Sequence, residues 1–209
     1  MTLSRISIAF CGVLCYASSA SAQERMPYIP KAQWTEAQKK AVEGLMSGKR
    51  AATDVTGPFI IEMRSPEFMD RAQRLGEFLR YMATLPPRLI EMVILLTARE
   101  WTQQYEYQAH TPLALKAGLK QEIITAITEG RRPTGMAEDE AATYDLCDEL
   151  DRNKSVSDAT YAHALKEFKE QGVVELIGLK GYYTMLAMLM NTNRTRVPDG
   201  KPPLPEFPH

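Results

Sequence analysis

The sequence predicts an all-α fold of antiparallel helical hairpins. Apolar residues recur every three to four positions through most of the chain, as they do on the buried face of an amphipathic helix. Proline and glycine divide these stretches into segments of helical length. The two-residue alternation of a half-buried strand does not compete with this pattern at any point, so we expect helices packed on helices.

The first 22 residues have the composition of an export signal. Arg5 precedes a short apolar run at 6–16, and Ala20, Ser21 and Ala22 form a small-residue cleavage site. The run is too short to cross a bilayer about 30 Å thick. We therefore expect cleavage before Gln23 and an exported protein, periplasmic or secreted, without a stable membrane anchor. The remaining residues, 23–209, suit a single domain.

Charge and cysteine content exclude two further classes. The chain has 25 Lys and Arg against 26 Asp and Glu residues and no basic stripe, so nucleic acid is not expected as a partner. Cys11 and Cys15 lie in the export signal, which leaves Cys147 without a disulfide partner in the mature chain. Carboxylates beside Cys147 would raise the pKa of its thiol, so we interpret it as a half-buried structural residue.

The first predicted helix covers 35–47, where Thr35 and Gln38 form a capping-box pattern and Gly48 follows. The segment 49–63 contains Gly57-Pro58 and then Phe59-Ile60-Ile61. We expect an irregular connection there that packs against the core or lines a pocket. Ser65 and Pro66 open the next helix. Its predicted buried face consists of Phe68, Ala72, Leu75, Leu79 and Met82.

Pro86 and Pro87 end that helix, and another is predicted from about residue 88. Its buried side carries Leu89, Met92, Val93 and Leu96, with Glu91 beside them. The following helix begins near Thr102 and contains His110. Because Pro112 comes soon after, we expect it to kink or restart there before Gly118 ends it.

The C-terminal half predicts short helices at 120–129 and 138–150 and a longer one from Ser157 or Asp158 to about 171. The stretch 173–191 is the most apolar of the chain. Glu175 and Lys180 interrupt it, which favours a buried core helix over a membrane span. The tail, VPDGKPPLPEFPH, is rich in proline and is predicted to lie extended on the surface or on a neighbouring subunit.

His110 and the polar residues around it are the strongest candidates for a functional site. Gln103, Glu106 and His110 share one face of a helix because they are three and four residues apart. Glu91 lies in the preceding helix. If the two helices pack together, these side chains could move protons or hold a metal. A histidine–carboxylate pair that only joins two helices is the structural alternative.

Two stretches carry a resemblance to a known family: PPRLIEMVILLTAREWTQQYEYQAHTPLALKAGL and ELIGLKGYYTMLAMLMNTNRTRVPDGKPPLP. They resemble the carboxymuconolactone decarboxylase family, which includes the alkyl hydroperoxidase D-like proteins. The resemblance implies an all-α fold, a homotrimer or homohexamer, and an active site near the helix that carries the histidine.

In the peroxidase branch, the family pattern is a glutamate, a Cys-x-x-Cys pair and then a histidine. Aligned on this sequence, the glutamate falls on Glu91 and the histidine on His110, whereas the cysteine positions fall on Gln103 and Glu106. Without a thiolate, peroxidatic attack and a disulfide intermediate are not possible at this site.

The resemblance thus implies a carboxy-lyase-like enzyme that performs decarboxylation or isomerisation on a small carboxylated or lactone-like molecule, without cofactor or metal. A histidine whose pKa is raised by a neighbouring carboxylate could supply the proton. We expect His110, Glu106 and Glu91 to be catalytic and Gln103, Tyr107 and Trp101 to bind substrate. Three alternatives stay open: a metal site at the same acidic residues and His110, an alkyl hydroperoxidase-like redox protein, and a non-catalytic oligomeric binding protein.

Overall fold

A computed structural model describes residues 23–50, 52–197 and 203–205, and the predicted export signal lies outside these residues. The regular structure in the described part of the chain is helical, which confirms the all-α prediction. The elements are η1 (Lys31–Gln33), α1 (Glu36–Ser47), α2 (Pro58–Glu62), α3 (Pro66–Tyr81), α4 (Pro87–Glu100), α5 (Gln104–Lys116), α6 (Gln121–Thr128), α7 (Glu138–Asn153) and α8 (Asp158–Asn193).

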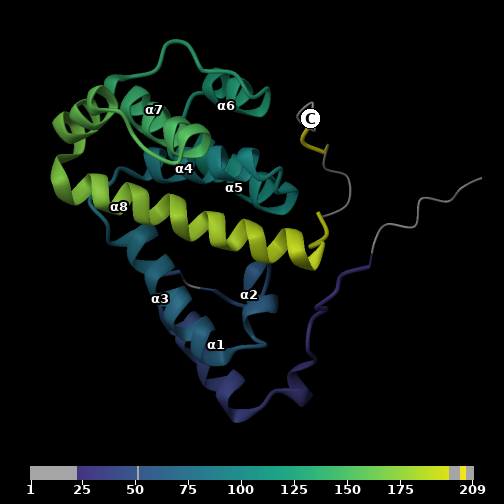
Figure 1. The fold of residues 1–209 in the computed structure, drawn as a ribbon. Helices are drawn as coiled ribbons and strands as arrows, with labels where there is room; N and C mark the ends of the chain where they lie inside the picture. Colours follow the sequence, from purple (N-terminus) through teal and green to yellow (C-terminus); the bar gives the residue numbers. More distant parts are fainter. Residues whose placement is uncertain (1–22, 51, 198–202, 206–209) are drawn as a thin grey trace, which may run out of the picture.

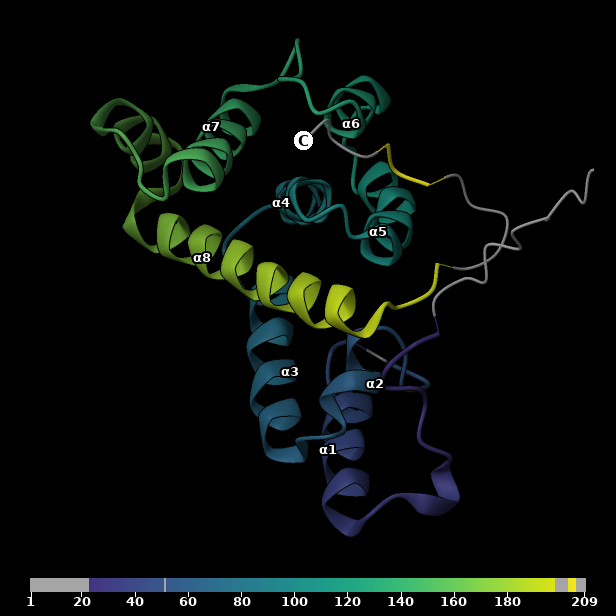
Figure 2. The ribbon, with the colours of Figure 1, turned by 45° about the vertical axis from the view of Figure 1, so that its right-hand side comes forward.

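The long helix α8 runs between two groups of helices. Helices α4, α5, α6 and α7 lie on one side of it, and α1, α2 and α3 lie on the other (Figures 1 and 2). Helix α8 contacts α2, α3, α4 and α7 directly, and α4 also packs on α5, α6 and α7. Residues from both groups therefore meet along the C-terminal half of α8.

The N-terminal elements follow local sequence signals, with one correction. The Thr35 hydroxyl accepts a hydrogen bond from the backbone N–H of Gln38, and the Gln38 side chain accepts one from Thr35, as the capping-box pattern predicts. The predicted irregular connection is partly wrong, because residues 58–62 form helix α2. Gly57 has a φ of 55°, a conformation that favours glycine, and Pro58 then occupies the first turn.

Helix α3 buries a different face from the predicted one. Ala72 and Leu79 are buried as expected, but Phe68, Leu75 and Met82 are 39%, 49% and 48% exposed. The principal contacts of α3 are with α1, α2 and α8, so side chains that face away from these helices are exposed. Met69, Gln73 and Gly76 complete this face.

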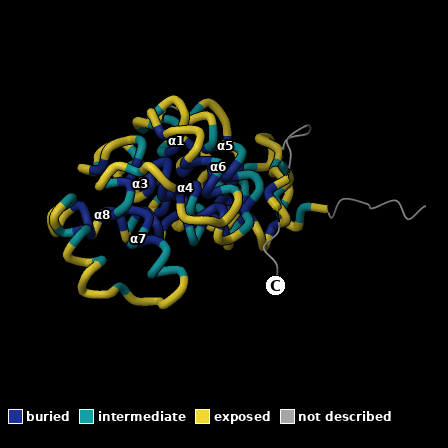
Figure 3. The backbone as a smooth tube through the Cα atoms, turned by 90° about the horizontal axis from the view of Figure 1, so that it is seen from above, coloured by how far each residue is buried: buried dark blue, intermediate teal, exposed yellow. Residues whose placement is uncertain are grey.

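Helix α4 is the central helix, and burial extends around nearly its whole circumference. Leu89, Met92 and Val93 are buried as predicted, and so are Glu91 and Arg99. Four helices surround α4, and the dark blue buried backbone concentrates around it in Figure 3. Glu91 is therefore an interior residue, so any partner it has lies inside the protein.

The sequence predicted a helix interruption at Pro112 and another between residues 171 and 173, and the structure differs at the two places. Helix α5 begins at Gln104, after Thr102 adopts a φ of 45°, and it continues through Pro112 to Lys116. In α8, Lys169 has non-helical dihedral angles, φ 60° and ψ 176°, which separate a polar first part from the apolar second part. The two predicted helices thus exist as two parts of α8.

Helix α8 is long and apolar enough to cross a membrane, but 56% of its apolar window is buried inside the structure. Two charged residues of α8 are bonded within the protein. Glu175 accepts a hydrogen bond from the Thr84 hydroxyl, and the Lys180 ammonium lies 2.7 Å from Asp151. These features are those of a core helix.

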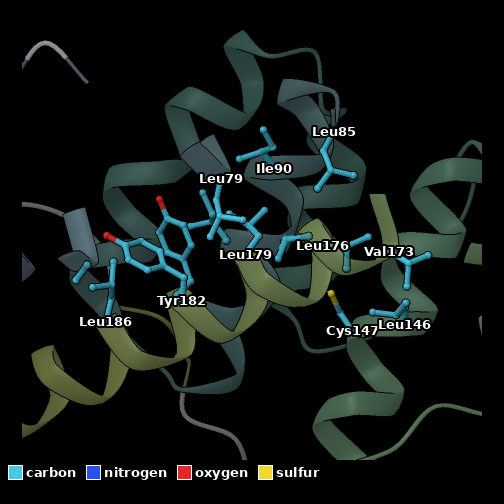
Figure 4. Close-up of a cluster of buried hydrophobic side chains, with 14 of the residues drawn as sticks. Leu79, Leu85, Ile90, Leu146, Cys147, Val173, Leu176, Leu179, Tyr182 and Leu186 are labelled. Atoms are coloured by element: carbon cyan, nitrogen blue, oxygen red, sulfur yellow. The ribbon is translucent and has the colours of Figure 1, made fainter. Parts of the chain in front are cut away.

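The largest apolar cluster joins α8 to α3, α4 and α7. Figure 4 shows Cys147 in this cluster together with Leu146, Val173 and Leu176. Cys147 is fully buried, more deeply than predicted.

Of the C-terminal tail, residues 203–205 are described. Leu204 is buried, and its backbone N–H and carbonyl bond the side chain of Gln104 at 2.6 and 3.2 Å.

Candidate functional site

A cavity of about 860 Å³ lies where α3, α4, α5, α8 and the segment before α2 meet. Each of these elements contributes side chains to its wall, and several of them are ionisable. The ionisable residues used below are Arg50, Arg80, Glu91, Glu106, His110 and Tyr183. The cavity therefore combines groups from distant parts of the chain.

The α4–α5 contact brings the predicted histidine and glutamate together. Nδ1 of His110 lies 2.6 Å from Oε2 of Glu91. The other oxygen of Glu91 accepts a hydrogen bond from Nη2 of Arg80 at 3.1 Å, so both carboxylate oxygens have partners. The Tyr183 ring meets the imidazole edge-on, with centroids 5.5 Å apart. These contacts hold the ring in one orientation.

The environment determines the protonation states of the pair. Burial lowers the pKa of His110, so its imidazole is neutral near pH 7, contrary to the predicted rise. Burial opposes ionisation of Glu91, but hydrogen bonds from His110 and Arg80 outweigh it and lower the pKa of Glu91. An ionised Glu91 accepts the Nδ1–H, which leaves Nε2 of His110 with a lone pair. His110 is then a neutral base held by a carboxylate.

Glu106 lies one helical turn before His110, and its protonation state is opposite to that of the ionised Glu91. Its Oε2 is buried without a hydrogen-bond partner, and the residue is 3% exposed. Burial raises the pKa of Glu106 well above its usual value, although the charge of Arg80 opposes the rise. Glu106 therefore lines the cavity as a neutral carboxylic acid that can donate a proton or a hydrogen bond.

The structure places the three predicted substrate-binding residues away from this cavity. Gln103 caps α5 by accepting from the Glu106 N–H, and its amide donates to Asn191. The Tyr107 hydroxyl bonds Thr128 at 2.6 Å. Trp101 ends α4 at the surface. Helical spacing placed the first two on the helix that carries His110, but tertiary contacts engage them elsewhere.

Three residues that line the cavity were not predicted from the sequence. Arg80 lies in the last turn of α3, and Arg50 lies in the segment before α2, so neither shares a helix with His110. Tyr183 lies in the apolar part of α8. Two adjacent tyrosines, at 182 and 183, in an otherwise aliphatic helix are the one signal that could have indicated a polar site there.

Neither a thiol nor a metal cluster is evident at the cavity. Cys147 lies in the apolar cluster between α7 and α8, and burial raises the pKa of its thiol to about 12. Among the residues described by the structure, no group of three or more His, Cys, Asp or Glu side chains is arranged to hold a metal ion.

Comparison with known proteins gives a family match over part of the chain and a similar fold. The carboxymuconolactone decarboxylase family matches residues 66–146, which contain Arg80, Glu91, Glu106 and His110. A search of the curated proteins finds no match.

The fold is similar to that of a protein of unknown function from Agrobacterium tumefaciens, proposed to be the antioxidant defence protein AhpD, with a TM-score of 0.59. The two chains are 16% identical, and the likeness covers 66% of this chain and 94% of that one. A likeness at 16% sequence identity is evidence for a shared fold alone. Residues 66–146, called the family region below, thus match the carboxymuconolactone decarboxylase family, and the helical fold of the chain is similar to that of the Agrobacterium tumefaciens protein.

Proposed function

We propose that this protein is an enzyme of acid–base chemistry that decarboxylates or isomerises a small carboxylated or lactone-like carbonyl compound, without a cofactor. The observation that carries the proposal is the pairing of opposite proton states in one cavity. Neutral His110 offers a base, and protonated Glu106 offers an acid. Environments that separate the pKa values of neighbouring groups in this way are typical of acid–base sites.

In an isomerisation, Nε2 of His110 takes the proton from a carbon next to the substrate carbonyl. The electron pair moves onto the carbonyl oxygen, where the Glu106 acid stabilises the charge by donating a hydrogen bond. The imidazolium then returns the proton to a different carbon. Glu91 stabilises the imidazolium, and Arg80 keeps Glu91 ionised.

In a decarboxylation, the electron pair of the bond to the carboxylate moves into the carbonyl as CO2 leaves. The same Glu106 hydrogen bond stabilises the resulting enolate. The proton that replaces CO2 comes from the Glu106 carboxyl group, which regains one from solvent after product release. The isomerisation uses His110 and Glu106 and the decarboxylation uses Glu106, so the position of the substrate in the cavity decides between them.

Deuterium incorporation tests the proposal without knowledge of the natural substrate. A panel of γ-lactone acids and keto acids is incubated with the protein in D2O, and NMR follows exchange at the carbon next to the carbonyl together with CO2 release. We expect His110→Ala to lower exchange by at least about 100-fold. His163→Ala is the matched control, because His163 pairs with the exposed Glu138 on another face. Exchange that survives in His110→Ala would refute the proposal.

We also propose that the protein is exported and forms a homotrimer or homohexamer. The composition of residues 1–22 supports export. Apolar side chains exposed on α3, at its C-cap and on α8, among them Leu75, Met82 and Val174, support association. Cell fractionation tests the location, and light scattering coupled to size exclusion tests the subunit number. A cytoplasmic monomer would refute both proposals.

A further inference from the structure

Arg50 brings a cationic side chain to the cavity from outside the family region. It lies in the segment between α1 and α2, sixteen positions before residue 66. Its guanidinium is 4.9 Å from the centroid of the Phe59 ring and 6.0 Å from that of Tyr81. These two aromatic rings, from α2 and α3, position Arg50 at the cavity wall.

One edge of this guanidinium has no hydrogen-bond acceptor. Nε and Nη2 of Arg50 are both buried without a partner. These two N–H groups are parallel and lie on the same edge, the arrangement that a planar carboxylate accepts with two hydrogen bonds. Arg80 differs, because its Nη2 already bonds Glu91. Arg50 is thus the cavity arginine available to a ligand.

We propose that Arg50 is the specificity-determining residue of the cavity, which binds the carboxylate of the substrate through its Nε–Nη2 edge. This inference rests on the proposed function, since it names the group that holds the substrate while His110 and Glu106 act at the other end. A buried N–H without an acceptor is unfavourable because it has lost its hydrogen bonds to water. A ligand carboxylate would satisfy two of them, whereas a neutral ester or amide would not supply the opposite charge.

Glu62 keeps this edge available. Both of its carboxylate oxygens are buried without a hydrogen bond, and the residue is 2% exposed. Burial raises the pKa of Glu62 to about 8, although the charge of Arg50 opposes the rise. Near pH 7 Glu62 is therefore largely neutral and does not compete for Arg50. Above pH 8 it ionises and becomes an internal competitor for the same guanidinium.

Two groups interact electrostatically with Glu62, one from the segment before α2 and one from α8. Arg50 belongs to the preceding segment, and Tyr182 of α8 interacts electrostatically with Glu62. Tyr182 interacts in turn with Glu106 of α5 and Arg80 of α3. Burial raises the pKa of Tyr182 above that of a free tyrosine, so this residue stays neutral through the pH range of the test.

Binding of matched acids and esters tests the proposal. Calorimetry compares 5-oxotetrahydrofuran-2-carboxylate and 4-oxopentanoate with their methyl esters, and inorganic phosphate is added as a non-planar anion. In the wild type we expect each acid to bind at least about tenfold more tightly than its ester and than phosphate. Arg50→Ala should remove this preference, and Arg50→Lys should restore only part of it because an ammonium lacks the two-donor edge.

Arg71→Ala is the matched control, because Arg71 lies on the exposed face of α3 and pairs with Glu67. It should bind the acids like the wild type. Equal affinity of acid and ester in the wild type, or an acid preference that persists in Arg50→Ala, would overturn the proposal. Phosphate binding as tightly as the acids would show a general anion site and would overturn the carboxylate assignment.

The pH dependence separates a ligand-binding arginine from a structural one. Between pH 8 and pH 9.5 we expect the dissociation constant of the acid in the wild type to rise by up to about tenfold per pH unit. Glu62→Gln should abolish this rise, because the amide cannot ionise. A rise that persists unchanged in Glu62→Gln would overturn the role of Glu62.

Deuterium exchange distinguishes failure of this inference from failure of the proposed function. The methyl esters carry the exchangeable C–H but no carboxylate, so their exchange should depend on His110 and not on Arg50. If His110→Ala loses exchange on both acid and ester while Arg50→Ala changes neither binding nor exchange, the carboxylate assignment is wrong and the acid–base function stands. If His110→Ala changes nothing, the proposed function is wrong.

Discussion

His110 and Glu91 are joined by a hydrogen bond of 2.6 Å between Nδ1 and Oε2, and this bond connects the two consecutive helices α4 and α5. Because Glu91 is ionised and accepts the Nδ1–H, the bond decides that Nε2 is the ring nitrogen that can accept a proton. Arg80 completes the arrangement by donating to the other oxygen of Glu91.

Replacing Glu91 by glutamine should lower kcat by about 100-fold or more. The amide can donate to Nδ1, which favours the tautomer with its proton on Nε2 and removes the base. Deuterium exchange on a γ-lactone acid measures the effect. Glu100→Gln, at an exposed position of the same helix, is the control and should keep its activity. Equal loss in both variants would indicate a general disturbance of α4.

The pH profile should reflect His110 as a base and Glu106 as an acid. Burial lowers the pKa of His110 below its usual 6.5, so the acid limb of kcat/KM, where the imidazole gains a proton, should be centred below pH 6.5. Burial raises the pKa of Glu106, so in the Glu62→Gln background, where Arg50 has no internal competitor, the alkaline decline reports the loss of the Glu106 proton and should disappear when Glu106→Gln is added. An acid limb centred above pH 6.5 would contradict the assignment of His110.

Glu62 should make the protein less stable as pH rises. The unfolded chain loses this proton near pH 4.5, whereas the folded chain keeps it to about pH 8, so the folded state binds more protons in this window. The free energy of unfolding should fall by at most about 5 kcal/mol between these pH values for this reason. Urea unfolding at several pH values should show a smaller fall in Glu62→Gln than in the wild type. The control Glu122→Gln, at an exposed position, should show the same fall as the wild type. Parallel curves for wild type and Glu62→Gln would exclude the effect.

Cys147 should be unreactive in the folded protein. Its thiol is fully buried among apolar side chains, and burial raises its pKa to about 12. A chromogenic disulfide reagent should modify Cys147 rapidly after denaturation and negligibly before it. Cys147→Ser should lower the free energy of unfolding by about 1–3 kcal/mol and leave exchange activity unchanged. Peroxide reduction lost in Cys147→Ser would instead support a thiol mechanism.

Gly76 should tolerate no side chain, because a Cβ there would overlap the hydroxyl of Tyr182 at the α3–α8 contact. Gly76→Ala should lower the free energy of unfolding by about 1–3 kcal/mol. At Gly181, in α8, a Cβ would meet nothing within 4 Å, so Gly181→Ala should stabilise the helix by about 0.5–1 kcal/mol. Thermal denaturation compares the two, and equal effects would contradict this packing.

Local chemistry allowed much of the fold to be predicted. The capping residues Thr35 and Gln38, the proline at 66 and the glycines at 118 and 130 mark helix ends through interactions with near neighbours, so the sequence displays them directly. The errors arose where packing decided. Residues 58–62 form a helix despite the irregular pattern, and α3 exposes three apolar residues that its periodicity placed inside.

The candidate site divides in the same way. The sequence by itself determined that Glu106 and His110 share a helical face and that a glutamate precedes them in a neighbouring helix, because helical spacing is a local property. Only the tertiary structure brought Arg80, Tyr183 and Arg50 to the cavity and turned Gln103, Tyr107 and Trp101 away from it. It also decided which carboxyl group is neutral, since burial and contacts with distant residues set each pKa.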